Sequence, residues 1–258
     1  MERIGETKSK GLTAASIRVW GILLVAAGMI GRCILQNTLL GIKGLNAQQM
    51  LEVLSAKPDS MSIAAVALVM QCLEACAIPI FALLLAEGFR HTKDWKKYLL
   101  RVAVIALISE IPYDLAMNGK LLDMSAQNPC IGLVLGMVVL YLYSRFCEPT
   151  ASHRLLKVFV LIAAIVWAEM LCVDHGTPLV VLITVFWLMR NRTSLRGLAG
   201  AGISMLCTVV SPFYLASSMG CLLAHLYNGE PGESNRVVNY LAYPVLLTAV
   251  FLAAKFLF

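Results

Sequence analysis

The stretch that decides the fold of this chain is residues 79–116, PIFALLLAEGFRHTKDWKKYLLRVAVIALISEIPYDLA. Two apolar segments flank a basic connector, and both carry acids at positions where a membrane helix normally has hydrocarbon side chains. Glu87 ends the first segment; Glu110 and Asp114 lie in the second, on one helical face because they are four residues apart. An ionised acid at mid-membrane costs about 2.5–3.5 kcal/mol. We therefore expect these carboxyl groups to serve a function.

The composition predicts an all-α polytopic membrane helix bundle, with residues 1–258 as one transmembrane domain. Hydrophobic residues make up 59% of the chain and charged residues 14%, and the mean hydropathy is +0.79. Soluble domains are about one-quarter charged. The apolar runs are continuous rather than alternating, which disfavours a β-barrel. The net charge of +6 lies in the connectors between these runs, so we expect the lipid bilayer and not nucleic acid as a partner.

The hydropathy pattern predicts about eight membrane spans, near residues 17–40, 62–86, 98–117, 129–146, 155–173, 178–190, 198–226 and 238–257. The seventh run is long for one crossing and short for two. Ser211-Pro212 interrupts it, so a broken helix and a tight hairpin are both open. The eight cysteines contain no CxxC pair, and we predict no metal site.

The distribution of cations predicts a cytoplasmic N-terminus by the positive-inside rule. If the seventh run crosses once, sixteen of the 21 Lys and Arg residues lie on the inner side and four on the outer side, with Arg32 inside the first span. The inner set is Arg3, Lys8, Lys10, Arg18, Arg90, Lys93, Lys96, Lys97, Arg101, Arg145, Arg154, Lys157, Arg190, Arg192, Arg196 and Lys255; the outer set is Lys43, Lys57, Lys120 and Arg236.

The first candidate site lies at the inner end of the second span. Glu87 and His91 are i,i+4 neighbours, and a carboxylate that orients an imidazole raises its basicity for acid–base catalysis. A charge pair that ties down a helix end is the structural alternative. The cations beside this pair can hold the phosphates of a cytosolic donor such as an acyl-coenzyme A, or of an anionic lipid, or can serve only as topology determinants. They are Arg90, Lys93, Lys96, Lys97 and Arg101.

The second candidate site is Glu110 with Asp114, on either side of Pro112. A proline inside a span frees a backbone carbonyl, and such kinks commonly line cavities. Arg32 in the first span is the expected partner of these two acids, and a structural buried ion pair is the alternative reading.

Asp174 and His175 form a third, secondary candidate. On a helix, adjacent side chains point in different directions, so we expect a poor catalytic dyad and a role in capping the outer end of the fifth span. Glu74 and Glu169 are further acids within spans for which the sequence indicates no partner.

The order of several motifs resembles the TraX family. The residues that carry the resemblance are PIFALLLAEGFRHTKDWKKYLLR, ALISEIPYDLA, VDHGTPLVVLITVFWL, and LYNGEPG before NYLAYP. The sequence departs from the family pattern in two places. Family members carry an Asp-His pair before Ile-Gly in the first span, where this chain has Gly28-Met29, and often Tyr-Pro-x-His in the last span, where this chain has Leu246. The first-span histidine is the general base of related acyltransferases.

The resemblance implies an acyltransferase of the bacterial cytoplasmic membrane. It would move an acyl (acetyl) group from cytosolic acetyl-CoA or another acyl-CoA to a pilin-like protein or an envelope glycan, without a metal. Because the usual pair is absent, His91 is the remaining imidazole on the inner side that can act as the base, and His175 is the one on the outer side. We expect His91 to take the role, oriented by Glu87, while Glu110 and Asp114 shape the acceptor or proton path. Two alternatives stay open. The chain can be a non-catalytic membrane partner of the same fold, or a proton-coupled transporter using Glu74, Glu110 and Asp114.

Overall fold

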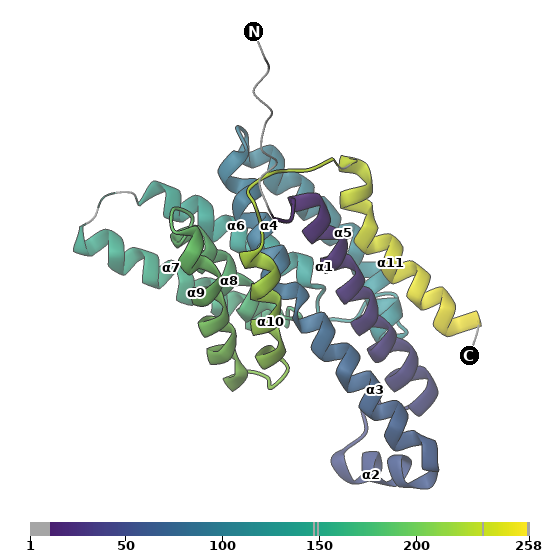
Figure 1. The fold of residues 1–258 in the computed structure, drawn as a ribbon. Coiled ribbons are helices and arrows are strands. Elements are labelled where there is room, and N and C mark those ends of the chain that lie inside the picture. Colours follow the sequence, from purple (N-terminus) through teal and green to yellow (C-terminus); the bar gives the residue numbers. More distant parts are fainter. Residues whose placement is uncertain (1–10, 147, 149, 234, 257–258) are drawn as a thin grey trace.

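The structure is a computed structural model that describes residues 11–146, 148, 150–233 and 235–256. These residues form packed helices and no strand (Figure 1), which confirms the all-helical prediction. In chain order the elements are α1 (Ala14–Met29), the π-helix η1 (Ile30–Leu40), α2 (Ala47–Ala56), α3 (Pro58–Ala75), α4 (Ala77–His91), α5 (Trp95–Asn118), α6 (Pro129–Arg145), α7 (Ala151–Met170), α8 (Gly176–Leu188), α9 (Thr193–Leu206), the 3₁₀ turn η2 (Cys207–Val209), α10 (Tyr214–His225) and α11 (Arg236–Phe256).

Four stretches of the described chain are long and apolar enough to cross a membrane: Ala14–Leu40, Pro58–His91, Ala151–Met170 and Val237–Phe256. These stretches are compatible with a multi-pass membrane protein, whereas the predicted count of eight spans is not confirmed. α6 and α8 are apolar but shorter. α5 has 24 residues and carries charged side chains along its length. α7 lies at the flank of the bundle, and its outward side chains are apolar, as in helices that face lipid (Figure 1).

One end of the bundle gathers the start of α1, the end of α4, the start of α5 and the start of α9. We call it the basic end; it carries Arg18, Arg90, His91 and Arg101. Arg90 joins two of these segments by donating to the Arg190 carbonyl at 3.4 Å. At the opposite end, Lys43 contacts the last turn of α5 at Met117 and Asn118.

The seventh apolar run folds as a helical hairpin, one of the two alternatives left open by its sequence. α9 and α10 lie side by side (Figure 1), with Ser204 and Ser217 3.3 Å apart towards the tip and Gly197 against His225 at the base. The 14 residues of α9 rise about 21 Å, which is less than the roughly 30 Å of a hydrocarbon core. The hairpin therefore returns the chain to the end at which it entered.

α11 consequently starts at the basic end. The segment after α10 runs beside the start of the described chain, where Leu12 donates to the Leu226 carbonyl at 2.9 Å and accepts from the Asn228 amide at 3.0 Å. The side assigned to the last helix depends on whether this run crosses once. With the hairpin, Arg236 counts with the cations of the basic end and Lys255 with those of the opposite end, so the totals of sixteen and four are unchanged. Three of the inner cations, Arg3, Lys8 and Lys10, lie outside the described residues.

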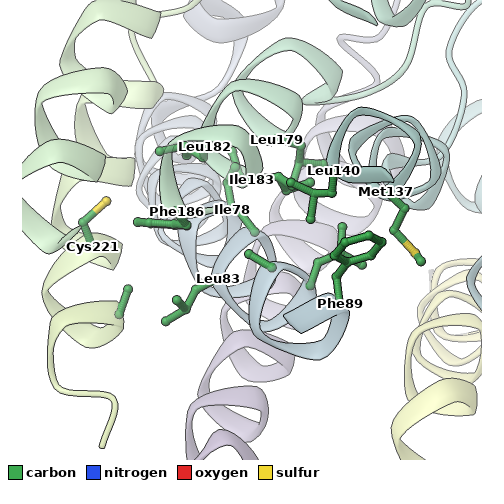
Figure 2. Close-up of a cluster of buried hydrophobic side chains, with 14 of the residues drawn as sticks. Ile78, Leu83, Phe89, Met137, Leu140, Leu179, Leu182, Ile183, Phe186 and Cys221 are labelled. Atoms are coloured by element: carbon green, nitrogen blue, oxygen red, sulfur yellow. The ribbon is translucent and has the colours of Figure 1, made fainter. Parts of the chain in front are cut away.

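The largest buried cluster lies where α4, α6, α8 and α10 meet (Figure 2). Two glycines allow these helices to come close. A Cβ at Gly136 of α6 would lie 2.4 Å from the Ile183 side chain, and one at Gly220 of α10 would lie 2.0 Å from the Cys76 carbonyl oxygen. Any side chain at position 220 would push α10 away from the joint between α3 and α4. That joint ends α3 one residue after Glu74, whose side chain is buried.

Candidate functional site

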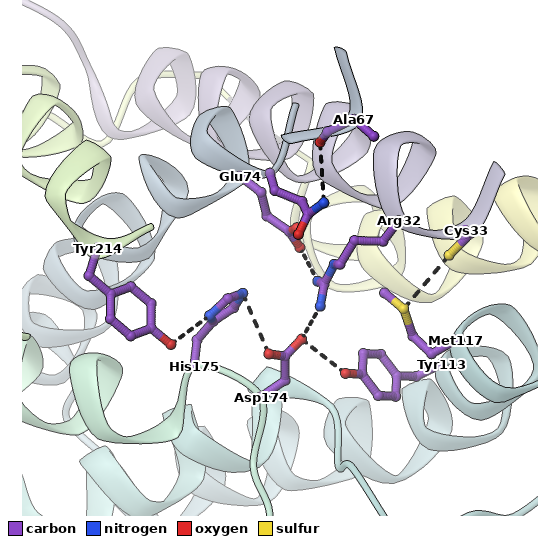
Figure 3. A network of polar contacts seen from close by, with 10 residues as sticks. Arg32, Cys33, Ala67, Glu74, Tyr113, Met117, Asp174, His175 and Tyr214 are labelled. Atoms are coloured by element: carbon purple, nitrogen blue, oxygen red, sulfur yellow. Dashed lines mark hydrogen bonds and ion pairs between the residues drawn. The ribbon is translucent and has the colours of Figure 1, made fainter. Parts of the chain in front are cut away.

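A buried ion network centres on Arg32, the third residue of η1 (Figure 3). Its Nη2 lies 2.5 Å from Glu74 Oε1 and its Nη1 2.7 Å from Asp174 Oδ2. The Tyr113 hydroxyl donates to the same Asp174 oxygen at 2.9 Å. The prediction that Arg32 pairs with Glu110 and Asp114 is therefore wrong, because η1 faces α3 and the turn before α8. The partner of Glu74 that sequence reasoning lacked is Arg32.

Asp174 and His175 lie in a tight turn between α7 and α8. Cys172 and His175 both have a positive φ, of 51° and 56°, a conformation that non-glycine residues adopt rarely. Gln127 holds the turn by donating its amide to Cys172 O at 2.9 Å and accepting from the Asp174 amide at 2.8 Å. The two side chains face each other, with His175 Nε2 3.6 Å from Asp174 Oδ1. At that distance the pair makes no hydrogen bond, so the structure does not overturn the expectation of a poor dyad, although the two residues lie in a turn and not on a helix.

The imidazole of His175 has a second polar neighbour. Its Nδ1 lies 3.0 Å from the hydroxyl of Tyr214, the first residue of α10. Among the described residues, His175 Nε2 is buried and makes no hydrogen bond. Sequence reasoning missed Tyr214; the only signal was the Ser211-Pro212 interruption, which marks the hairpin that brings the start of α10 to the turn before α8. Asp174, His175 and Tyr214 together form a chain of groups able to orient one imidazole and move its proton.

A cavity of about 660 Å³ connects the basic end with this network. Its volume lies in the range of small-molecule sites. At the basic end it is lined by His91, Arg101 and Tyr98, and at depth by Glu74 and His175. Its walls between these ends are mainly apolar and come from α1, α4, α5, α6 and α11: Ile22, Val25, Phe81, Leu84, Val102, Ile105, Leu133 and Leu246. We call this cavity the chamber.

Glu87 and His91 stand at the mouth of the chamber. His91 Nε2 lies 3.5 Å from Glu87 Oε2, as the i,i+4 spacing predicts. The other Glu87 oxygen accepts a 2.7 Å bond from the buried Arg196 of α9, and the His91 side chain is 68% exposed. Glu87 therefore fastens the hairpin to α4 as well as contacting the imidazole.

The expected donor-binding cations all have exposed side chains at the basic end, and Arg101 is the one that lines the chamber. The others are Arg90, Lys93, Lys96 and Lys97. Asp94 begins α5 by accepting from the Lys97 amide at 3.1 Å. That hydrogen bond lowers the pKa of the Asp94 carboxyl, so a carboxylate lies within the cluster.

Glu110 and Asp114 face away from the chamber, towards the segment 119–128. Glu110 contacts the side-chain amide of Asn128, and Asp114 Oδ2 accepts from the Asp123 amide at 2.8 Å. Asn128 also donates to the Ala106 carbonyl at 2.9 Å. These bonds hold the segment 119–128 against α5, along which it runs back as far as Ala106, near the middle of the helix. The structure thus brings Glu87, His91, Glu74 and His175 to one chamber and does not bring the Glu110–Asp114 pair there.

The space that a side chain at position 28 would take is filled by Glu74 of the facing helix α3. A Cβ there would lie 2.2 Å from both Cβ and Oε2 of Glu74. Met29 is fully buried in a separate apolar cluster with Tyr113 and Leu247. A carboxylate therefore lies beside position 28 even though residue 28 has no side chain.

Residues 60–253 match the family model described as TraX protein. No curated protein and no solved structure shows significant similarity to the chain. Among the described residues, no group of three His, Cys, Asp or Glu side chains is arranged to hold a metal ion.

Proposed function

Because the chain belongs to the TraX family, we propose that it is a membrane acyltransferase that uses an acyl-CoA donor at the basic end. The acyl group, acetyl in the simplest case, passes to an amine or hydroxyl of a pilin-like protein or an envelope glycan. The single observation that carries this proposal is the chamber, which joins the exposed cations of the basic end to the buried imidazole of His175.

The basic end suits the nucleotide part of the donor. Arg101 lines the mouth, and Arg90 and Lys96 are exposed beside it. Guanidinium and ammonium groups bind phosphates through charge-assisted hydrogen bonds. The arm that links the nucleotide to the thioester is long and narrow, and the mainly apolar walls of the chamber suit it. The proposed orientation places the basic end in the cytoplasm, where acyl-CoA is found.

Two imidazoles line the chamber, and the geometry favours His175 as the general base. The Tyr214 hydroxyl contacts Nδ1 at 3.0 Å and orients the ring, while Nε2 lies 3.6 Å from Asp174, makes no hydrogen bond and can take a proton. His91, the base expected from the sequence, is largely exposed, and its carboxylate partner also binds Arg196. We assign His91 and Glu87 to the mouth.

The proposed reaction needs one proton transfer in each direction. His175 takes a proton from the acceptor amine or hydroxyl as the nucleophile forms its bond to the thioester carbonyl carbon. The carbon–sulfur bond then breaks, and the imidazolium returns the proton to the coenzyme A thiolate. Arg32 holds Asp174 through the 2.7 Å contact and so keeps the carboxylate beside the imidazole.

The test is acyl transfer from radiolabelled acetyl-CoA by the full-length protein purified in detergent. The acceptor is unidentified, so membranes of an expression strain that lacks the protein supply it. We expect His175→Asn to lose labelling at least 100-fold, while His153→Asn, a histidine remote from the chamber, retains it. His91→Asn separates the two assignments, because only a catalytic His91 would give a comparable loss. Absence of coenzyme A binding in isothermal titration would instead favour the non-catalytic membrane partner.

A further inference from the structure

The side chain of Tyr243 presents an unexplained polar atom to the chamber. Tyr243 lies about two turns into α11, and its side chain lines the chamber. Its hydroxyl is buried and, among the described residues, has no hydrogen-bond partner. Burying a hydroxyl without a partner costs about 1–3 kcal/mol, so native proteins usually satisfy such groups. The hydroxyl therefore faces a space that something else fills.

The surroundings of this hydroxyl place it at the deep end of the chamber. The Tyr243 side chain packs against the cluster that contains Tyr113, whose hydroxyl donates to Asp174. Cys130, Glu74 and His175 all line the chamber at that depth. Tyr240 also lines the chamber, as do Arg18 and Tyr98 near the mouth.

Two unpartnered polar atoms thus border the same deep end, and they are chemically complementary. His175 Nε2 and the Tyr243 hydroxyl are both buried without a hydrogen bond. An imidazole nitrogen can take a proton, and a phenol hydroxyl donates a hydrogen bond at neutral pH. A carbonyl group under nucleophilic attack needs both: a base for the nucleophile and a donor for the oxygen on which negative charge develops.

We propose that Tyr243 binds the carbonyl oxygen of the acyl thioester and stabilises the oxyanion formed on it. This inference rests on the proposed function and names the second reacting group of that site. When the acceptor nitrogen or oxygen bonds to the carbonyl carbon, the π electrons move to the carbonyl oxygen. The Tyr243 hydroxyl donates to that oxygen without giving up its proton. When the carbon–sulfur bond breaks, the carbonyl re-forms, and the proton held by His175 goes to the thiolate.

The test is Tyr243→Phe, which removes one oxygen and keeps the ring that lines the chamber. Removing one oxyanion donor lowers kcat about 10²–10³-fold, so we expect a loss of that size for acetyl-CoA. The KM for acetyl-CoA should stay within threefold, because the bond strengthens only as charge develops. The matched control is Tyr143→Phe, which removes a buried hydroxyl that bonds the Lys157 carbonyl at 2.7 Å, outside the chamber. Its kcat should match that of the wild type.

The outcomes distinguish a failure of the proposed role of Tyr243 from a failure of the proposed acyl transfer. If the wild type is active and Tyr243→Phe has the same kcat, the inference is overturned and water is the partner of the hydroxyl, while the proposed function stands. A wild type that transfers no acyl group would overturn the proposed function and the inference with it. Replacement of Tyr243 by 3-fluorotyrosine guards against misfolding, because it keeps the ring and the hydroxyl. We expect it to retain kcat, and a loss equal to that of the Phe variant would overturn the inference.

Discussion

The Nη1 atom of Arg32 donates to Oδ2 of Asp174 at 2.7 Å, and so joins η1 to the turn before α8 across 142 residues of sequence. The second terminal nitrogen of the same guanidinium binds Glu74 of α3. One cation therefore compensates two carboxylates inside the bundle. Its two contacts tie η1, α3 and the turn before α8 together at the deep end of the chamber.

Replacing Arg32 by Met should destabilise the protein strongly. The substitution leaves Glu74 and Asp174 as buried carboxylates without a cation, and breaking a buried pair in this way costs about 3–5 kcal/mol. Because 19% of the Arg32 side chain is exposed, we expect the lower part of that range. The free energy of unfolding in mixed detergent micelles measures the effect. The matched control is Arg154→Met, an exposed cation at the start of α7, which should change stability by less than about 0.5 kcal/mol.

The same substitution in a chain without the two acids tests why Arg32→Met lowers the free energy of unfolding. In a chain that carries Glu74→Gln and Asp174→Asn, the buried negative charges are gone, so Arg32→Met should cost much less than in the wild type. Equal losses in the two backgrounds would show that Arg32 acts through packing and not through charge compensation.

Gly28→Ala should destabilise the protein although alanine is the better helix former. The new Cβ would lie 2.2 Å from the Glu74 side chain, so Glu74 must move and its contact with Arg32 must weaken. Overpacking of this kind costs about 1–3 kcal/mol. Gly202→Ala on α9 is the matched control: a Cβ there meets open space, and we expect a gain of up to about 1 kcal/mol. Thermal unfolding of the two variants checks the opposite signs.

The same steric argument predicts a rescue. With Glu74→Gly both the Cβ and the carboxylate that would meet residue 28 are gone, so Gly28→Ala should then cost nothing or stabilise the helix. Additive effects of the two changes would mean that Gly28 is needed for a reason other than the Glu74 side chain.

The sequence predicts the features that depend on composition and local spacing. The helical class and the approach of His91 to Glu87 follow from hydropathy and from the 3.6-residue period. The family assignment is confirmed by the match over 60–253. Whether the run at 198–226 doubles back is not predicted, because the choice depends on the packing of Gly220 against Cys76, which no local pattern reveals.

The polar network is the part that the sequence does not predict, for two physical reasons. The sequence offers several intramembrane acids as partners for Arg32, and only the packing of the helices selects Glu74 and Asp174. The orientation of His175 depends on a positive φ, which Gln127 stabilises from the distant 119–128 segment. Local propensity does not favour a positive φ at a histidine, so the approach of the His175 ring to Asp174 and Tyr214 arises only in the folded chain.

Asp114→Ala should loosen the 119–128 segment. The substitution removes the acceptor of the Asp123 amide and leaves a part-buried donor unpaired, at a cost of about 1–3 kcal/mol. Hydrogen–deuterium exchange of amides in that segment should become faster, since the segment can open without global unfolding. Asp59→Ala, an exposed acid in the first turn of α3, is the control and should leave exchange at 119–128 unchanged.

Glu110→Gln distinguishes the anchoring role from a catalytic one. The glutamine keeps an oxygen that accepts from Asn128 but has no ionisable group. We expect acyl transfer within threefold of the wild type, because Glu110 does not line the chamber. A loss of 100-fold in a folded variant would return Glu110 to the reacting groups.

The hairpin of α9 and α10 makes a prediction about topology that a single crossing contradicts. If the run re-enters, the segment 229–233 lies on the same side of the membrane as the connector between α8 and α9, and the C-terminus lies on the other side.

A cysteine introduced as Glu233→Cys, in a Cys172→Ser background because Cys172 is exposed, reports the side of that segment. With a cytoplasmic basic end, a membrane-impermeant maleimide should label it only after the membrane is opened, above the level of the same chain without the introduced cysteine. A fluorescent protein fused after the last residue should stay dark and an alkaline phosphatase fused there should be active, since each works on only one side. Labelling of Glu233→Cys in intact cells together with a fluorescent C-terminal fusion would show that residues 198–226 cross once, and Tyr227 could then not line the mouth of the chamber beside Arg196.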